Sequence, residues 1–496
     1  MTSSPSTVAV IGSGLAGLSA AIQAHEAGHV HVVLIEKEKN IGGNSMKATS
    51  GINAVEPLSN DTEQLFVQDT LQSGGGLSKA NLVDKLVHES EEAVAWLKAH
   101  SNDQSLDLSV LSQCGGHSRA RTHRCPPRPD GGPVPVGWKL VDTLKGHLLS
   151  LDHVKILTET RALELLKSED QISGVKVEDG HGQREIKADA VILASGGFGG
   201  QTATTQPDQR PSLMKTYAPQ FLNIATTNGP WANGDGIQLG LGVGAALRDM
   251  DQVQIHPTGF IDPQHPNAST KFLAPEALRA YGAVLLNGQG HRFADELWRR
   301  DALSKAIFDQ ANKVTERPHS WMTKLSLTVP AAYMVMTDEA VEGFGKSTLG
   351  FYASKGFFIK HDTVASLATQ LDTDAQELQQ EFKDYDEHFE KQTADAFGKT
   401  RFPCRLLPAH GTTYWVSMVT PCVHYTMGGL QIDETAQVMN DKQQPVVGLY
   451  AAGEVTGGVH GHNRLAGNSL LECVVYGRTA GRYAANHAKK SHQSPQ

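Results

Sequence analysis

Five segments of the sequence concentrate side chains that could bind an anion or move a proton. They are His256-Pro257-Thr258-Gly259, Glu276-Ala277-Leu278-Arg279, Arg299-Arg300-Asp301, His424-Tyr425-Thr426-Met427-Gly428-Gly429 and the glycine-rich residues 453–472. Arg464 lies inside the last of these, where its planar guanidinium could grip a carboxylate through two parallel hydrogen bonds. Each segment also has an ordinary explanation, because lone histidines are commonly core residues and Glu276 and Arg279 are spaced like a surface helix pair. The elements around these segments must decide between the two interpretations.

The N-terminal residues carry the pattern of a dinucleotide-binding fold. Residues 8–11 are typical of a buried strand, Gly12-Ser13-Gly14-Leu15-Ala16-Gly17 follows at once, and residues 18–26 are typical of a helix. The first glycine makes the tight turn, the second lets the backbone reach a pyrophosphate, and the third allows close packing of helix on strand. A second strand, residues 30–35, ends at Glu36, which could accept hydrogen bonds from ribose hydroxyls.

A second strand–loop–helix unit lies near the C-terminal end. Residues 447–452 are apolar and predict a buried strand, and a helix is expected to begin at Ser469 after the glycine-rich loop. The N-terminus of a helix collects partial positive charge and unpaired N–H groups, which suits an anionic or electron-rich ligand.

Further glycine-rich turns are expected on the same side. Residues 42–53 form a small, polar, glycine-bounded segment soon after Glu36, which favours a flavin dinucleotide, with an ordinary βα loop as the alternative. Residues 195–200 follow another predicted buried strand. Asp235 could either cap the helix that follows it or face the cofactor.

Composition narrows the class of protein. The 496 residues are enough for two domains, and the formal charge of −9 (44 basic against 53 acidic residues) argues against nucleic acid or an anionic membrane as partner. No apolar run of membrane-spanning length occurs. The five cysteines lack a paired motif and the histidines lack metal-ligand spacing, so we expect no disulfide framework, no metal site and a reducing, cytoplasmic location.

The predicted fold class is α/β. A Rossmann-like FAD-binding domain is expected to be discontinuous, formed by residues 1–250 and 420–496, with an inserted α+β capping (clamp) domain at 251–419. Within the insertion, residues 363–371 and 373–391 predict two amphipathic helices joined at Asp372, which we expect to be an N-cap. Residues 113–136 form an irregular basic loop that either covers the flavin or is a solvated surface loop.

Taken together, the five segments closely resemble the flavoproteins of the fumarate reductase and succinate dehydrogenase family, and in particular the soluble, single-subunit fumarate reductases of fungi. The motifs HPTG, EALR, RRD, HYTMGG and HGHNRLAGNSLLE carry the resemblance, which extends over nearly the whole chain. The resemblance implies that His256, His424 and Arg464 bind substrate carboxylates, that Arg300 donates a proton, and that Glu276 and Arg279 relay protons to it. It also implies FAD-binding roles for Gly12, Ser13, Gly14, Leu15, Ala16, Gly17, Glu36, Lys37, Gly43, Asn44, Ser45, Thr49, Ser50, Gly51, Asp235, Glu454, Ser469 and Leu470.

The implied reaction is the reduction of fumarate to succinate. Hydride would pass from reduced FAD to one alkene carbon while negative charge develops beside the far carboxylate, and cationic donors would stabilise that charge. Asn44 stands where membrane-bound relatives attach FAD to a histidine, so we expect non-covalent FAD. Pro275 stands where many relatives have a threonine that touches substrate. No haem or flavin-transfer domain is apparent, so a diffusible reduced flavin or similar carrier is the expected electron donor.

Two other functions compete with this one. The scaffold could act on another α,β-unsaturated acid, or oxidise a steroid-like or amino-acid substrate, and Pro275 is the feature that favours such a change. Alternatively, the chain could be a flavin-binding subunit that delivers electrons without turnover. The complete set of Arg300, Glu276 and Arg279 argues against that third possibility.

Overall fold

The computed structural model describes residues 6–28, 30–101, 105–129, 134–205, 210–311, 327 and 329–491. Its largest sheet has nine strands, with the path β6-β2-β1-β10-β20-β8-β7 and with β19 (Gln437–Met439) and β9 (Gly182–Lys187) paired to β20 and β8. Five neighbouring strands are parallel: β6 (Val154–Leu157), β2 (His31–Ile35), β1 (Thr7–Ile11), β10 (Ala190–Leu193) and β20 (Pro445–Ala451). The mixed α/β fold with a parallel central sheet is therefore as predicted.

The register of this sheet gathers the predicted glycine loops at one edge. Ile11 lies beside both Ile35 and Leu193, and Leu193 lies beside Ala451, so four strands end at the same level. The strands are continuous apolar runs, as expected for parallel strands buried on both faces. Consequently the loops after β1, β2, β10 and β20 meet at their carboxyl ends, which is where open α/β sheets bind ligands.

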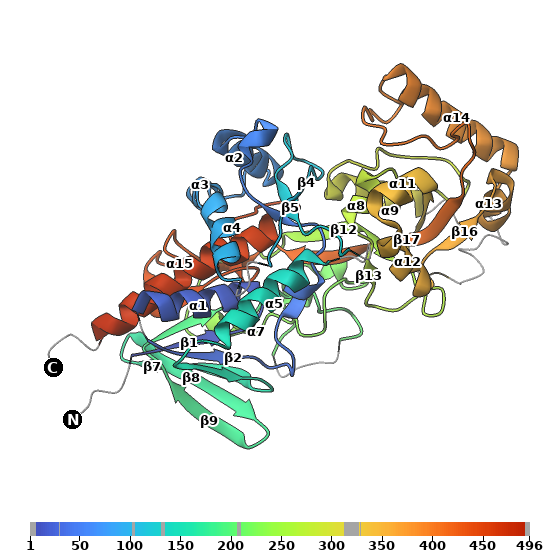
Figure 1. Cartoon of the computed structure of the whole chain (residues 1–496). Coiled ribbons are helices and arrows are strands. Elements are labelled where there is room, and N and C mark those ends of the chain that lie inside the picture. Colours follow the sequence, from blue (N-terminus) through green and yellow to red (C-terminus); the bar gives the residue numbers. More distant parts are fainter. Residues whose placement is uncertain are drawn as a thin grey trace.

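Two helices from opposite ends of the chain pack side by side against this sheet, α1 (Leu15–Gly28) and α15 (Asn468–Ser491) (Figure 1). Glycines in α15 make the close approach possible. A Cβ added at Gly477 would lie 2.7 Å from the Ala16 carbonyl oxygen, and one at Gly481 would lie 2.4 Å from the Ala20 carbonyl oxygen. The predicted helix start at Ser469 is one residue late, because α15 begins at Asn468. The helix then continues to Ser491.

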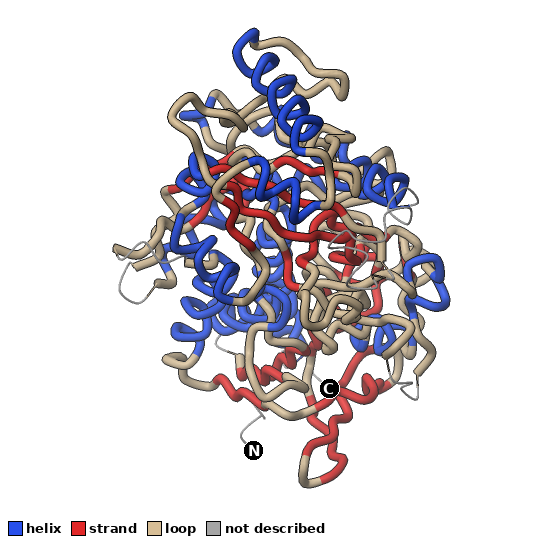
Figure 2. The backbone as a smooth tube through the Cα atoms, turned by 90° about the vertical axis from the view of Figure 1, so that its right-hand side faces the viewer, coloured by secondary structure: helices blue, strands red, loops and turns tan. Residues whose placement is uncertain are grey.

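The remaining elements of this region extend the sheet and cover it. A tight turn at residues 180–181 joins β8 (Gln171–Asp179) to β9 (Gly182–Lys187), and β8 also pairs with β7 (Arg161–Ser168). Helices α2 (Glu63–Ser73), α3 (Ala80–His88), α4 (Ser90–Ala99), α5 (Val136–Leu148) and α7 (Asp235–Leu241) complete it, with a small sheet of β3 (Ile52–Asn53), β4 (Val110–Ser112) and β5 (Thr122–Arg124). Seen from the side, the strands near the N-terminus lie at the lower end of the molecule, with the helices above them (Figure 2).

A second region is built on a six-stranded sheet with the path β13-β12-β17-β15-β14, in which β16 also pairs with β17. Its strands are β12 (Val253–Phe260), β13 (Phe272–Leu273), β14 (Val284–Leu286), β15 (Ala332–Thr337), β16 (Ile359–His361) and β17 (Tyr414–Thr426). Its helices are α8 (Glu276–Ala280), α9 (Arg300–Ala311), α11 (Asp338–Phe344), α12 (Lys346–Ser354), α13 (Val364–Leu371) and α14 (Ala375–Lys391). The antiparallel pair β12–β17 runs back into the first region.

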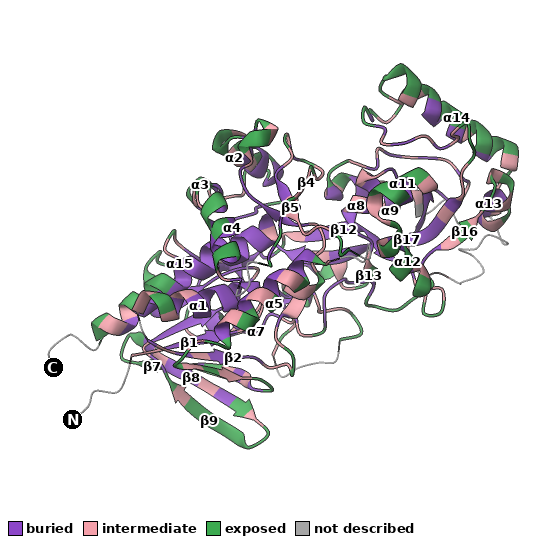
Figure 3. Cartoon of the chain, viewed as in Figure 1, coloured by how far each residue is buried: buried purple, intermediate pink, exposed green. Residues whose placement is uncertain are grey.

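The buried apolar side chains fall into separate clusters. One cluster takes its residues from 8–255 and 423–488, and two others lie entirely within 260–419. Burial is densest in the parallel strands, α1 and α15, whereas α14 turns an exposed face outward (Figure 3). No helix of the described residues is long and apolar enough to cross a membrane.

One predicted cap is wrong. Asp372 was expected to be an N-cap, but it closes α13 in the left-handed conformation, with φ of 57°. The N-cap of α14 is Asp374, whose carboxylate accepts the N–H groups of Gln376 and Glu377 at 2.7 and 3.0 Å. Both aspartates suit a helix terminus, and sequence spacing alone did not distinguish the end of one helix from the start of the next.

Candidate functional site

The loops at the carboxyl edge of the parallel sheet line a cleft of about 690 Å³, which α12 of the second region also borders through Phe351 and Tyr352. The residues with predicted cofactor roles that line it are Gly12, Ser13, Gly14, Leu15, Ala16, Glu36, Lys37, Gly43, Asn44, Ser45, Thr49, Ser50, Gly51, Asp235, Glu454, Ser469 and Leu470. Arg300, His424 and Arg464 line the same cleft. Gly17, His256, Glu276 and Arg279 do not.

The first glycine loop fits a dinucleotide for steric reasons. Gly12 has φ of +101°, and a Cβ at Gly17 would lie 1.9 Å from the Gly12 carbonyl oxygen, so both residues must lack a side chain for the turn to form. Gly14 differs, because a Cβ there would meet only the Ser45 hydroxyl at 3.4 Å and the Gly42 carbonyl at 3.9 Å. The backbone at Gly14 is therefore open toward the cleft, at the position that a pyrophosphate approaches.

Polar atoms without protein partners also indicate that a ligand belongs in this cleft. The Thr49 hydroxyl and the Trp231 indole N–H both line it, both are buried, and neither has a hydrogen-bond partner among the described residues. Buried polar groups are normally satisfied, so such atoms mark places where a bound molecule completes the hydrogen bonding. The loops, the backbone opening at Gly14 and these two atoms together fit FAD.

The acidic residues of the cofactor end are held by neighbours. Glu36 accepts the Ser13 amide N–H at 3.0 Å and also contacts the Ser13 hydroxyl. Asp235 pairs with Lys37 at 2.6 Å and with Arg161 at 3.1 Å. Burial raises the pKa of Asp235, but these two cations outweigh it and the pKa lies below its usual value. The N-cap of α7 is Gly234, so of the two expected roles Asp235 faces the cleft rather than capping the helix.

The segment after the second strand is tied to loops on both sides. The Ser45 hydroxyl accepts the Leu15 N–H at 3.1 Å. The Asn44 amide donates to Asn228 at 2.6 Å and accepts the Gly229 N–H at 3.0 Å. These bonds fix the segment as one wall of the cleft.

At the inner end of the cleft, Arg300 forms a buried ion pair with Glu276. The Arg300 Nε and Nη2 atoms each donate to the same Glu276 oxygen at 3.1 Å, and the other oxygen accepts the Gly115 N–H at 2.6 Å. Burial raises the pKa of Glu276, but Arg300 and Arg279 outweigh it, so the pKa lies below its usual value. Arg300 is the first residue of α9 and Glu276 is the first of α8, so two helix starts place this pair.

Arg279 lies deeper than the cleft and is not joined to Glu276 by a hydrogen bond, although the structure describes both residues. Its Nη1 donates to the Glu296 carbonyl at 2.5 Å, and its Nε and Nη2 atoms are buried without a partner among the described residues. Burial and the nearby Arg300 lower the pKa of Arg279. The structure thus brings Arg300 and Glu276 together, but among the described residues Arg279 makes no hydrogen bond to either of them.

Arg464 is the second cation of the inner end. Its guanidinium lies 4.5 Å from the centre of the Tyr425 ring, and its Nη1 donates to the Leu465 carbonyl at 3.0 Å. Its Nε is buried without a partner, and no carboxylate of the described residues pairs with it within 4.0 Å. Burial, followed by the repulsion of Arg300, lowers the pKa of Arg464 to about 10.

The two predicted histidines lie on neighbouring strands, His256 on β12 and His424 on β17, with ring centres 5.1 Å apart. His424 lines the cleft and its Nδ1 is hydrogen-bonded to the Thr227 hydroxyl at 2.7 Å. His256 lies behind it, with its Nε2 buried and unpartnered among the described residues. Burial and the charge of Arg300 hold the pKa of both rings well below its usual value, so both are neutral at pH 7.

The comparisons with known proteins agree with this geometry. A family model described as "FAD binding domain" matches residues 7–470. Fumarate reductase 1 of Saccharomyces cerevisiae is 38% identical over 504 residues, covering 98% of this chain and 99% of the yeast protein. The chain belongs to the fumarate reductase family of FAD-binding flavoproteins. The predicted resemblance is confirmed, and the cofactor of the family is FAD.

Other members of the family match over nearly the same length. The fumarate reductase of Schizosaccharomyces pombe is 38% identical over 490 residues, covering 96% of this chain and 89% of that protein. The structure of the open conformation of a flavocytochrome c3 fumarate reductase superposes with a TM-score of 0.75 at 30% identity, covering 98% of this chain and 79% of that one. The family therefore accounts for both regions of the molecule, not only the dinucleotide fold.

Sequence reasoning missed a glutamine that holds the inner end together. Gln254 accepts from Arg300 Nη1 at 3.0 Å and donates to the Asn463 side chain at 2.9 Å and to the Arg464 carbonyl at 2.8 Å. One amide thus joins β12, α9 and the glycine-rich loop. Its position two residues before His256 was the only available signal, and a lone glutamine has no distinctive spacing.

The basic loop at residues 113–136 is partly buried and partly exposed to solvent. Gly115 contacts Glu276, and Arg121, which is fully buried, pairs with Asp61 and Asp69 at 2.7 and 2.5 Å. Among the described residues of the loop, Pro135 alone lines the cleft, Gly115 supports the inner carboxylate, and Arg119 and residues 127–129 are exposed to solvent. Residues 130–133 of this loop lie outside the described residues.

Proposed function

We propose that this protein is a fumarate reductase that converts fumarate to succinate with electrons from reduced FAD. One observation supports this most strongly: Arg300 and Arg464, two buried guanidinium groups, line the same cleft as the predicted FAD loops, and Arg464 has no carboxylate partner among the described residues. A dicarboxylate would supply the missing negative charge. The full-length similarity to proteins named fumarate reductase supports the same substrate.

Arg464 and His424 would orient the substrate by gripping a carboxylate. Arg464 offers a planar fork of donors, and His424, which is neutral and oriented by Thr227, adds a side chain that can donate one hydrogen bond without a competing charge. His256 lies behind His424 and would contact substrate only through its unpartnered Nε2. Clamping the substrate in this way lowers the entropy cost of the reaction.

Bound FAD, when reduced, supplies hydride to one alkene carbon. Arg300 would give a proton to the other carbon, and the charge that builds up beside the far carboxylate would be stabilised by Arg300 and Arg464 more than the ground state is. Glu276, 3.1 Å from both Nε and Nη2 of Arg300, would return the proton to the guanidine. Arg279 would act on this pair through its charge, since no hydrogen bond of the described residues links it to Glu276.

Several finer points belong to the same proposal. FAD would be bound non-covalently, since the Asn44 amide is hydrogen-bonded to Asn228 and Gly229 and has no nucleophilic nitrogen. The donor would be a diffusible reduced flavin or similar carrier. The clusters of buried apolar residues support a division into an FAD-binding domain at 1–250 and 420–496 and a capping domain at 251–419. A cytoplasmic location remains a prediction.

A second substrate class is favoured by Pro275. It is the N-cap of α8, immediately before Glu276, and it offers no side-chain hydrogen bond. A threonine at this position would add a side-chain hydroxyl next to Glu276. Without that hydroxyl, the site would discriminate less strongly between fumarate and other α,β-unsaturated acids. A site rejects an analogue most strongly when the analogue leaves polar groups of the site unpaired.

The experiment is the anaerobic reoxidation of a chemically reduced dye by the purified yellow protein, first with fumarate and then with a monocarboxylate analogue such as acrylate. Oxidation by fumarate alone, with flavin released on acid denaturation, is the expected result. Oxidation by both acids would instead indicate a reductase that accepts a broader range of α,β-unsaturated acids. A protein whose flavin neither acid reoxidises would be an electron-delivery subunit or would act on another substrate.

A further inference from the structure

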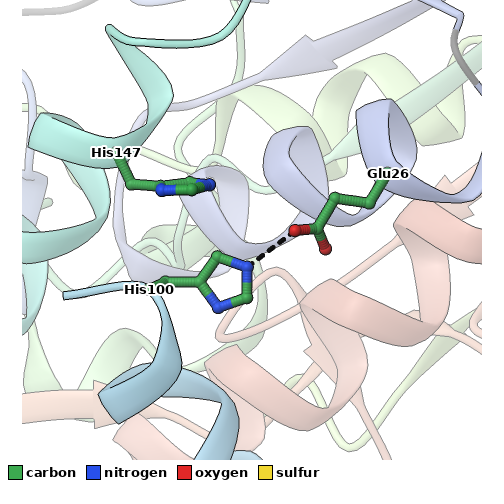
Figure 4. Close-up of side chains that lie close together, drawn as sticks. All are labelled: Glu26, His100 and His147. Carbon is green, nitrogen blue, oxygen red and sulfur yellow. Dashed lines mark hydrogen bonds and ion pairs between the residues drawn. The ribbon is translucent and has the colours of Figure 1, made fainter. Parts of the chain in front are cut away.

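Three side chains of metal-ligand type meet on three helices of the FAD-binding region, and none of them lines the cleft (Figure 4). Glu26 lies in the last turn of α1, His100 follows α4 directly, and His147 lies in the last turn of α5. One ligand atom of each lies within 4.8 Å of the others. Because the three residues come from distant parts of the chain, spacing in the sequence gave no sign of them.

The hydrogen bonds of His100 indicate that a proton or a metal ion lies beside its Nε2 atom. Its Nδ1 lies 2.7 Å from the Trp96 carbonyl, which can only accept, so Nδ1 carries the proton of the neutral ring. Its Nε2 then presents a lone pair to a Glu26 oxygen at 2.7 Å. Two acceptors at that distance repel unless a proton or a metal ion joins them.

His147 supplies a second nitrogen to the same place. Its ring meets the His100 ring edge to face, with centres 4.6 Å apart and planes at 84°. Its Nε2 is buried and has no hydrogen-bond partner among the described residues. A buried imidazole nitrogen left unsatisfied is uncommon, and a metal ion would account for it.

The backbone around the cluster favours positive charge. α1, α4 and α5 all end at it, and a helix C-terminus carries partial negative charge from its unpaired carbonyl groups. Arg478 opposes this, because its charge acts on His100, although Arg478 also donates to Glu92 at 2.5 Å. The bond from His100 Nδ1 to a backbone carbonyl is the support that metal-binding histidines usually have.

We propose that Glu26, His100 and His147 bind one divalent transition-metal ion, of which Zn²⁺ is the best match. Two imidazoles and one carboxylate are a common zinc ligand set, with solvent as the fourth ligand on the exposed Glu26 side. Ligand atoms around tetrahedral zinc lie about 3.3 Å apart, and the three ligand atoms here lie within 4.8 Å of one another, so side-chain adjustments would bring them to that spacing around the ion. The ion would link α1, which follows the dinucleotide loop, to α4 and α5. This proposal contradicts the expectation from sequence that no metal site exists.

The test uses the full-length FAD-loaded protein, stripped with a chelator, dialysed and titrated with Zn²⁺ in a calorimeter. We expect one ion per chain and a higher melting temperature with Zn²⁺. His100→Ala and His147→Ala should each weaken binding by more than about tenfold, since even the loss of a supporting residue costs that much. His88→Ala is the matched control, because His88 lies 3.3 Å from Glu63 but has no second histidine, and it should bind Zn²⁺ normally.

Flavin absorbance and circular dichroism show whether each variant is folded. Glu26→Gln, at an exposed position, keeps the shape of the side chain and should also weaken binding. Co²⁺ in place of Zn²⁺ should give the visible absorption of a four-coordinate site in the unmodified protein. Failure of the stripped protein to bind micromolar Zn²⁺, or equal binding by the unmodified protein and both histidine variants, would overturn the proposal and leave a protonated His100 as the cation.

Discussion

The two ends of the cleft satisfy their charges in opposite ways. At the cofactor end, Glu36 is bonded to Ser13 and Asp235 is paired with Lys37, so the acidic groups already have partners. At the inner end, Arg464 has no carboxylate partner among the described residues. The cofactor end is thus organised by the protein itself, whereas the inner end holds positive charge that a bound anion would complete.

This difference has an energetic meaning. A buried polar group without a partner costs about 1–3 kcal/mol, and a charged group costs more. The unpartnered atoms of Arg279, His256 and Arg464 therefore destabilise the protein without ligand. That cost is consistent with a site built for a charged substrate rather than for folding, and binding of a dicarboxylate would recover part of it.

The largest expected effect lies at the inner end. Arg300→Gln should lower kcat by roughly 10²- to 10⁴-fold, because a positioned proton donor contributes about that much. FAD should remain bound, since the cofactor loops are independent of Arg300. The measurement is the rate of fumarate-dependent dye oxidation together with the flavin content of the variant.

Arg299→Gln provides the control for this prediction. Arg299 is the adjacent residue, and its side chain is 48% exposed and pairs only loosely with Asp301 at 3.5 Å. Its rate should be unchanged. Equal losses in both variants would show that charge in this helix start, and not a proton donor at Arg300, controls the rate.

The same contrast explains what the sequence could reveal. The glycine loop at 12–17 and Glu36 were predictable because their roles depend on backbone geometry within one short segment. The pairing of Arg300 with Glu276 was implied by family motifs, but no local rule gives it, since two separate helix starts create it. Gln254 escaped notice because its contacts join three segments that only the folded chain brings together.

A pH dependence should come from Glu454, a buried carboxyl that lines the cleft. Burial raises the pKa of this carboxyl from 4.5 to about 7. Between those values the folded protein binds the proton that the unfolded chain has lost, so its stability contribution is complete below about pH 4.5 and disappears as the pH rises through 7. The loss should be of the order of 3 kcal/mol.

Urea unfolding of the flavin-free protein at several pH values measures this effect, with Glu454→Gln as the reference. The glutamine variant should show a flatter stability profile between pH 4.5 and 7. A profile as steep as that of the unmodified protein would assign the dependence to another group.

Arg464→Gln should raise the KM for fumarate by roughly 10- to 150-fold, the loss expected for a hydrogen bond to a charged group. The kcat should fall less than in Arg300→Gln, because carboxylate binding is made in both the ground state and the transition state. A lower KM would contradict the proposed contact. Steady-state kinetics with a reduced dye separate the two constants.

Two glycines test the cofactor end, with smaller effects. Gly17→Ala should destabilise the folded chain by about 1–3 kcal/mol, because its Cβ would lie 1.9 Å from the Gly12 carbonyl and the turn would have to move. Thermal unfolding without flavin measures this. An unchanged melting temperature would show that the loop is more adaptable than its contacts indicate.

Gly14→Ala should behave differently, because the nearest atoms to its Cβ would be the Ser45 hydroxyl at 3.4 Å and the Gly42 carbonyl at 3.9 Å. The flavin-free chain should lose less than about 1 kcal/mol. The methyl group would instead occupy the space that the pyrophosphate approaches, so FAD should bind more weakly although the fold is intact. Fluorescence titration with FAD measures the affinity. If Gly14→Ala binds FAD normally, the pyrophosphate does not approach this residue. The glycine loop would then define the cofactor end less completely than the charges define the inner end.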